Sequence, residues 1–448
     1  MGLTGGLKLK KRKETGFTAI YNMLNLPGST LELLTYSSLK GFMFTVTVAK
    51  GEDGGYLDYD GNKFKKDVTR YLLKIAVLSS NNDDYMPSYK NVTKRTESEK
   101  SYFDEAVMQQ TIWKRSITTG GKTPLCPPVA NFSTFGNRDS RYLLHFLISK
   151  ASSPETKGVL DYLYSDCIIS SKSLSTGIIV MPMISNSKTF SDYEDSRGLI
   201  ARTTRRKLDV VLDDAYIDAT AEMIRLFIDI GVLHFDAHMG NVLVYTTTTI
   251  DTPKCVVIDF GRASNIMNDD VNDEYLNTKE KKEVRAKKDA FYNRFLQGAD
   301  KKFDKKFDKK NDKKNFIKEV CEYYRSTDYT KNEKMFGSEL EDAESSWLWT
   351  YVEDQPDEFL EKVYDKLREI ITVTDETGIQ AATITRLEKE GRFFNINGKL
   401  KDFKVFFPRH LTTSTTTTTT RKRKRKNNSS SSSSKSKSKS KSKSSRSL

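Results

Sequence analysis

The stretch from Gly231 to Gly261 constrains this chain more than any other. It opens with the polar segment HFDAHMGN (234–241) and continues through two short apolar runs, NVLVYT and KCVVIDF, which are separated by the turn-rich TTTIDTP. Each apolar run has the length and composition of a strand. The preceding segment, 213–231, has a wide apolar face and closes at Gly231, as helices often do. The sequence therefore predicts a helix, a polar loop and a β-hairpin.

Three oxygen-bearing side chains lie at one end of this predicted hairpin. Asp236 and Asn241 belong to the loop before its first strand, and Asp259 follows its second strand. Because the two ends of a hairpin meet, we expect these side chains to converge. Phosphoryl transfer from ATP needs a carboxylate beside the acceptor hydroxyl and oxygen ligands for magnesium. The three residues are of the types that this chemistry requires.

A zinc site is the alternative interpretation of the same loop. His234 and His238 lie four residues apart, a spacing that places both on one face of a helix, as in zinc proteases. Gly231 and Gly240 disfavour a helix here, and no glutamate follows the first histidine. The pattern therefore favours the phosphate-transfer interpretation.

The segment HFDAHMGN resembles the catalytic loop of the protein-kinase-like superfamily, and IDFG resembles its magnesium-binding motif. The resemblance implies that Asp236 is the catalytic base, that His234 braces the loop, and that Asn241 and Asp259 are metal ligands for Mg²⁺. His238 stands where eukaryotic protein kinases usually have lysine, so the loop is similar to that of aminoglycoside and choline-type kinases. Taken together, these features resemble divergent serine/threonine-protein kinases of large DNA viruses, and the resemblance covers residues 31–265 well and the remainder poorly.

Such a fold also needs a strand lysine for the ATP phosphates and a helix glutamate to hold it. Lys74 lies in the middle of the apolar run YLLKIAV, where a lone charge requires a partner. The segment 98–116 has the apolar spacing of a helix, and it offers Glu105 as the first candidate partner and Glu99 as the second.

Other parts of the expected nucleotide site match the family less well. A G-x-G-x-x-G loop is missing, and Gly41 alone precedes the strand predicted at 41–49, with Ser37 and Ser38 as substitutes. Backbone groups around Met181 and Met183 would bind adenine. After DFG, the A-P-E sequence that normally seats a peptide substrate is also missing.

The resemblance predicts an α+β, bilobal kinase-like fold, with a β-rich N-lobe and a mainly helical C-lobe. Further strands are predicted at 70–79 and 177–185, and the run YLLHFLIS (142–149) also suits a buried strand. Amphipathic helices are predicted near Pro356. The expected divisions are a basic leader (1–30), the N-lobe (31–185), the C-lobe with a Lys-rich insertion near 279–315 (186–411) and a disordered tail (412–448).

Charge is distributed unevenly along the chain. Of the net charge of +14, residues 421–448 contribute twelve Lys and Arg and no acid, which leaves +2 for the rest. Three interpretations remain open for this tail: a solvated run of charges, a nuclear-targeting signal in RKRKRK, and a nonspecific contact with nucleic acid. The four cysteines lack CxxC spacing, and no apolar run reaches the roughly 18 residues of a membrane helix. We expect a soluble intracellular protein of undetermined oligomeric state.

The sequence thus favours a phosphotransferase that uses ATP and Mg²⁺ and acts on Ser/Thr hydroxyls of protein substrates. Two alternatives stay open. The loop histidine His238 also suits a small-molecule kinase, and the missing glycine-rich and A-P-E motifs also suit a pseudokinase that serves as a binding scaffold.

Overall fold

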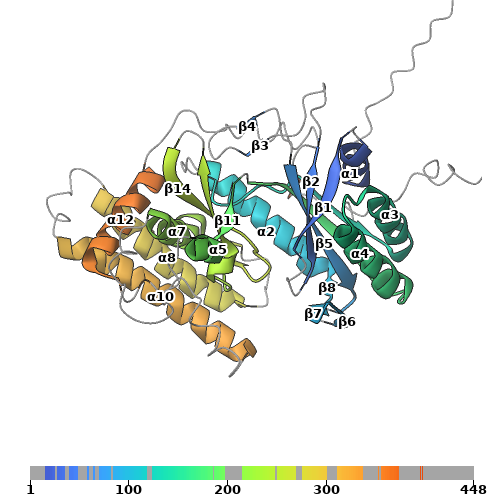
Figure 1. Cartoon of the computed structure of the whole chain (residues 1–448). Helices are drawn as coiled ribbons and strands as arrows, with labels where there is room; N and C mark the ends of the chain where they lie inside the picture. The colour runs from blue at the N-terminus through green and yellow to red at the C-terminus, as the bar shows by residue number, and fades with distance from the viewer. Residues whose placement is uncertain are drawn as a thin grey trace, which may run out of the picture. The chain divides into compact units, whose positions relative to one another are not determined.

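The computed structural model describes residues 16–25, 28–35, 40–48, 58–59, 64–65, 70–81, 84–118, 124–184, 186–196, 214–247, 250–268, 275–299, 310–336, 352, 355–372, 394 and 396. Contacts divide the chain into two units, residues 1–406 and residues 407–448. The described residues all belong to the first unit, which is a mixed α/β structure with an antiparallel sheet and several helices (Figure 1).

The main sheet has six strands in the order β1–β2–β5–β10–β9, with β8 beside β5. All of its pairs are antiparallel except the parallel pair of β5 with β8. The bounds of these strands are β1 Thr30–Thr35, β2 Phe42–Thr47, β5 Arg70–Ser79, β8 Glu97–Ser98, β9 Asn131–Phe135 and β10 Ser175–Pro182. Strands β2, β5 and β10 confirm the strands predicted at 41–49, 70–79 and 177–185.

Helices cover both faces of this sheet. Helix α2 (Glu99–Thr118) confirms the helix predicted at 98–116, and its Tyr102 packs with Ala76 of β5. Phe42, which pairs with Ile75 of β5, has its ring centroid 5.9 Å from that of Tyr162 in a second helix. Because successive strand residues face opposite sides, these two helices lie on opposite faces. The central strand β5 is therefore buried along most of its length.

The run YLLHFLIS is helical, so its prediction as a strand was wrong. It lies in α3 (Asn137–Lys150), which is followed by α4 (Pro154–Tyr162) and the π-type turn η1 (Leu163–Ile169). The buried residues of α3 repeat at the three-to-four spacing of a helix face: Ser140, Leu143, Leu144 and Leu147. Short apolar runs do not distinguish the two structures. The next helix does carry a start signal, since the side chain of Ser153 accepts a hydrogen bond from the Thr156 N–H before Pro154.

Helix α7 (Asp214–Arg225) and its continuation η2 (Leu226–Ile230) form the predicted helix at 213–231 and are buried almost throughout. The helix ends at Gly231, whose φ of 77° is left-handed. A Cβ atom at this position would also lie 2.5 Å from Met267 Cγ. Glycine is therefore required both by the backbone conformation and by the close approach of Met267.

The predicted hairpin is confirmed as β13 (Val242–Thr247) and β14 (Ile250–Val257), which pair antiparallel with Val242 opposite Val257. Strand β11 (Lys188–Thr189) extends this sheet, and α5 (Phe190–Ser196) follows it. The remaining short elements are β3 (Asp58–Tyr59), β4 (Phe64–Lys65), β6 (Tyr85–Tyr89), β7 (Val92–Arg95), β12 (Val232–Leu233), η3 (Met239–Asn241) and β15 (Ser264–Asn265).

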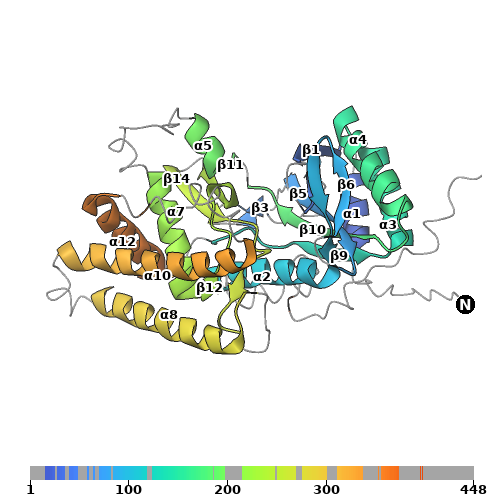
Figure 2. The ribbon, with the colours of Figure 1, turned by 90° about the horizontal axis from the view of Figure 1, so that it is seen from below.

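Three further helices pack around α7: α8 (Thr278–Ala299), α10 (Lys310–Phe336) and α12 (Asp357–Thr372) (Figure 2). Phe316 of α10 joins them, with ring centroids 5.7 Å from both Phe295 of α8 and Tyr364 of α12. The described part of the Lys-rich region near 279–315 therefore contributes helix α8, whose Val284 and Phe295 are buried. Helix α12, which begins after Pro356, confirms the helix predicted there. The repeat residues Phe303 and Phe307 lie outside the described residues.

The ends of the chain are described only in part. Helix α1 (Gly16–Asn25) lies within the expected loose leader, yet Ile20, Met23 and Leu24 are buried, so this part of the leader is packed. Residues 412–448 lie outside the described residues, and the expected domain boundaries stay a prediction. Among the described helices, none combines the length and apolar character needed to cross a membrane.

Candidate active site

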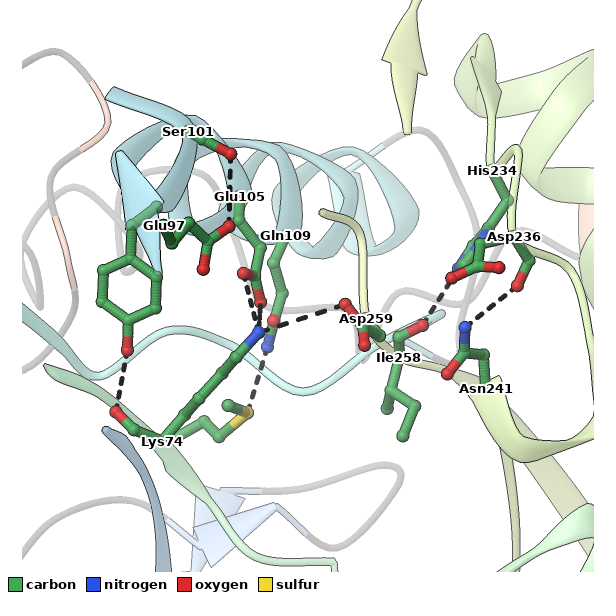
Figure 3. A network of polar contacts seen from close by, with 12 residues as sticks. Lys74, Glu97, Ser101, Glu105, Gln109, His234, Asp236, Asn241, Ile258 and Asp259 are labelled. Atoms are coloured by element: carbon green, nitrogen blue, oxygen red, sulfur yellow. Dashed lines mark hydrogen bonds and ion pairs between the residues drawn. The ribbon is translucent and has the colours of Figure 1, made fainter. Parts of the chain in front are cut away.

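Lys74 and Glu105 form a buried ion pair between the sheet and helix α2. Lys74 lies mid-strand in β5, and its Nζ donates to both carboxylate oxygens of Glu105, at 2.6 and 2.8 Å (Figure 3). Counted over the whole residue, backbone included, Lys74 is 8% exposed and Glu105 is 4% exposed. Glu105, rather than the alternative Glu99, therefore provides the contact that the sequence led us to expect. The role of the pair in nucleotide binding stays a prediction.

The charges around this pair hold the lysine in its protonated form. Burial lowers the pKa of Lys74, but the carboxylates of Glu105, Asp259 and Glu97 outweigh that effect, so the net direction is upward. Burial raises the pKa of Glu105 to about 7, against the opposing effect of the Lys74 ammonium. Three carboxyl groups thus surround one ammonium, and direct contact with both of its oxygens makes Glu105 the group that holds it.

Glu97 is a buried acid that the sequence did not single out. Its residue is 3% exposed, its Oε1 accepts from the Ser101 hydroxyl at 3.2 Å, and burial raises its pKa. Among the described residues, its Oε2 has no hydrogen-bond partner. The parallel pairing of Glu97 with Leu78 places it on the face of β5 that carries Lys74. In the sequence, Glu97 was recognisable only as a glutamate just before a predicted helix. Its position near Lys74 follows from the pairing of β8 with β5.

Gly41 directly precedes strand β2 and lies beside Lys74. Its φ is +145°, and a Cβ atom there would lie 3.2 Å from the Ile75 carbonyl oxygen and 3.7 Å from Lys74 Cε. Glycine therefore lets the backbone approach the lysine closely. The predicted role of Gly41 in binding phosphates stays a prediction, and Ser37 and Ser38 lie outside the described residues.

His234 anchors the polar loop to two distant elements. Its Nε2–H donates to the Ile258 carbonyl at 2.9 Å, and its backbone N–H donates to the Tyr324 hydroxyl of α10 at 2.6 Å. The side chain is fully buried, and burial lowers its pKa. The ring is therefore neutral, and its contacts are those of the brace that we expected.

Asn241 ties the loop to the end of the hairpin. Its side-chain Nδ2 donates to the Asp236 carbonyl at 2.9 Å, and its own carbonyl accepts from the Ile258 N–H at 2.9 Å. Asp259 is the next residue along the chain. Because the amide nitrogen is the donor, the amide oxygen is the atom that Asn241 can offer to a metal.

Asp259 lies between the two halves of the site. Its Oδ1 is 4.0 Å from Lys74 Nζ, and its side chain remains 47% exposed. Burial raises its pKa, but the Lys74 ammonium and a hydrogen bond from the Gly261 backbone outweigh that effect, so the pKa is lowered and the group is ionised. The accessible surface shows that an ion could still reach this carboxylate, although protein groups lie around it.

Two residues at the site adopt left-handed backbone conformations that are rare outside glycine. Phe235 has a φ of 55° and Asp259 has a φ of 59°. Each such conformation costs about 1–2 kcal/mol, and strained residues of this kind concentrate at functional sites. The strained residues are the one immediately before Asp236 and Asp259 itself, where the backbone helps to set the direction of the two carboxylates.

Asp236 has two neighbours of potential positive charge. Arg262 Nη1 donates to its Oδ1 at 3.2 Å, and His238 Nε2 lies 4.0 Å from the same oxygen. The other ring nitrogen of His238, Nδ1, accepts a hydrogen bond from the Gly240 N–H at 3.0 Å. Arg262 directly follows DFG, and the sequence did not single it out.

Figure 3 shows Lys74 and Glu105 on one side, His234, Asp236 and Asn241 on the other, and Asp259 between them. Asp259 and Asn241 supply a carboxylate and an amide oxygen, the hard ligands that Mg²⁺ prefers alongside phosphates and waters. Within the described ranges, no group of three or more His, Cys, Asp or Glu side chains is arranged to hold a metal. The zinc alternative therefore gains no support.

The two predicted adenine-binding positions lie at the C-terminal end of strand β10, Met181 within the strand and Met183 just after it. Met181 is buried, and its Sδ accepts from Gln109 Nε2 at 3.4 Å. The Met183 N–H donates to the Arg70 carbonyl at 3.1 Å. Because the Met183 N–H already donates to the Arg70 carbonyl, adenine would have to displace that carbonyl or bind to other groups.

Comparisons with known proteins add little to this geometry. No family model matches the chain, and no curated protein matches it. A solved structure described as WaaP in complex with acyl carrier protein is similar at 14% identity and a TM-score of 0.23. The match covers 74% of this chain and 88% of that chain. A likeness at that level carries no argument about fold or activity.

Proposed function

We propose that this chain is an ATP- and Mg²⁺-dependent phosphotransferase with a bilobal, protein-kinase-like arrangement. The observation that carries the proposal is the continuous set of contacts from Glu105 through Lys74 to Asp259. Next to Asp259, Ile258 is bound by both His234 and Asn241. A strand lysine, a helix glutamate, a loop base and two metal ligands thus occur together in the combination that phosphoryl transfer requires.

Each residue then has a defined task. Lys74 offers its ammonium to phosphate oxygens, and Glu105 fixes its position. Asp259 and Asn241 would hold Mg²⁺, which when bound neutralises charge on the phosphates. Asp236 orients the acceptor hydroxyl and takes up its proton. Since Glu105 and Lys74 are almost fully buried, their geometry is set before a nucleotide arrives.

We propose protein Ser/Thr hydroxyls as the acceptor. The support is the resemblance of HFDAHMGN and IDFG to kinase motifs, while His238 also suits a small-molecule kinase. A screen with radiolabelled ATP against generic proteins, sugars, cholines and lipids separates the two. If phosphate appears only on small molecules, the proposed phosphotransferase activity would stand and the proposed protein acceptor would be excluded.

The deciding experiment compares Asp236→Asn with the unaltered full chain in magnesium and radiolabelled ATP. We expect transfer to fall roughly 10²- to 10⁴-fold, the range for loss of a general base. Asp104→Asn is a matched control, because Asp104 lies beside Glu105 on α2 with its side chain 46% exposed. Equal activity of Asp236→Asn would end the proposal. A melting temperature unchanged by millimolar MgATP would instead indicate a scaffold, since ligands of the folded state raise it.

A further inference from the structure

Arg262 supplies the positive charge beside the proposed base. Its Nη1 lies 3.2 Å from Asp236 Oδ1, at hydrogen-bonding distance. The side chains of Arg262 and Asp236 are 37% and 23% exposed, so a substrate could reach both. Because Arg262 contacts Asp236, it lies beside the residue that would orient the acceptor.

The neighbouring histidine does not provide that charge in this arrangement. His238 Nδ1 accepts a hydrogen bond from the Gly240 N–H, and its Nε2 lies 4.0 Å from Asp236 Oδ1, beyond hydrogen-bonding distance. Lys74, the other cation of the site, is held by both oxygens of Glu105. The guanidinium of Arg262 is always charged, and its planar fork can donate to two acceptors at once.

We infer that Arg262 is a further catalytic residue, which bridges the Asp236 carboxylate and the phosphoryl group during transfer. This inference rests on the proposed function. In the step, the acceptor oxygen forms a bond to the γ-phosphorus of ATP while the bond from that phosphorus to the β-bridging oxygen breaks. The leaving ADP keeps the electron pair, and the acceptor proton passes to Asp236. Arg262 offsets the negative charge on the phosphoryl oxygens and keeps the carboxylate aimed.

The test measures kcat and KM for MgATP in Arg262→Ala, Arg262→Lys and the unaltered full chain. Loss of a preorganised charge donor typically lowers kcat by roughly 10²- to 10³-fold. We expect that loss for Arg262→Ala with KM changed less than about threefold, a partial recovery for Arg262→Lys, and rescue of Arg262→Ala by added guanidinium at low millimolar concentration. Guanidinium should not rescue Asp236→Asn.

Arg294→Ala is the matched control, because Arg294 is 36% exposed and pairs with Glu319 at 2.5 Å on the helices α8 and α10. It should keep the kcat of the unaltered chain. An Arg262→Ala variant with unchanged kcat, or with a higher one, would overturn the inference while leaving the proposed function intact. An unaltered chain that transfers no phosphate would overturn the proposed function, and the inference with it.

Discussion

The two ion pairs of the candidate site differ sharply in burial. In the Lys74–Glu105 pair the side chains are 10% and 3% exposed, and the ammonium contacts both carboxylate oxygens. In the Arg262–Asp236 pair they are 37% and 23% exposed, and one contact is made at 3.2 Å. One end of the site is therefore closed and fixed by the fold, whereas the other end is open to solvent.

This difference has a physical consequence for each pair. Removing one partner of a buried pair leaves an uncompensated charge in the interior, which costs several kcal/mol. An exposed pair is screened by water and contributes only about 0–1 kcal/mol to the free energy of unfolding. The open pair is the one beside the proposed acceptor, where a substrate must enter.

The largest effect is expected when the buried pair is broken. Lys74→Met should lower the free energy of unfolding by about 3–5 kcal/mol, because Glu105 is left as an unpaired buried charge. Urea unfolding measures this loss. The double variant Lys74→Met/Glu105→Leu should recover most of it, since neither charge then remains. A double variant as unstable as the single one would contradict a buried-charge origin.

The same variant should have a distinct pH dependence. Burial raises the pKa of Glu105 above its unfolded value, and removing the lysine raises it further. A carboxyl group whose pKa is raised by folding binds its proton more tightly in the folded state. The Lys74→Met variant should therefore lose stability as the pH rises through and above about 4.5, the pKa of Glu105 in the unfolded chain. Unfolding of Lys74→Met at pH 5 and pH 8 checks the sign, and greater stability at pH 8 would contradict it.

The next effect concerns the apolar contacts behind helix α2. Phe394 is 3% exposed, and its ring centroid lies 6.0 Å from that of Phe103 on α2 and 5.5 Å from that of Phe132. Phe394→Ala should cost about 3 kcal/mol, the lower end for a buried phenylalanine. Hydrogen exchange should show faster opening of α2. Tyr142→Ala, at a position 41% exposed, is the control and should change stability little.

A smaller effect is expected from His234. Burial lowers its pKa below the usual 6.5, so the unfolded chain binds the proton more readily. Stability should therefore fall as the pH drops below about 6.5, by at most about 1.4 kcal/mol per pH unit, until the folded pKa is reached. His234→Gln should flatten this dependence in urea unfolding between pH 5 and 7. An unchanged slope would show that other groups cause it.

The smallest effect belongs to the open pair. Arg262→Ala should change the free energy of unfolding by less than about 1 kcal/mol. The stability difference from the unaltered chain should shrink further between 0.1 and 1 M salt, since exposed pairs are screened. A loss of stability as large as that of Lys74→Met would contradict the difference between the buried Lys74–Glu105 pair and the more exposed Arg262–Asp236 pair.

The sequence predicted much of the framework because those signals are local. Gly231 ends a helix through its own backbone preference, and the strands around Lys74 show the composition of buried strands. A mid-strand charge such as Lys74 needs a partner, but Glu105 was expected from the kinase resemblance, since the two residues lie 31 positions apart. The segment 142–149 was mispredicted because a short apolar run gives the same pattern in a strand and a buried helix.

What the sequence by itself determined is the order of helix, polar loop and hairpin, and hence which polar side chains lie at one end of it. Only the tertiary structure decided that Glu97 shares the face of Lys74, that Tyr324 holds the loop through His234, and that Arg262 contacts Asp236. The reason is physical: backbone preferences act over a few residues, whereas these contacts join segments whose proximity depends on how the whole core packs.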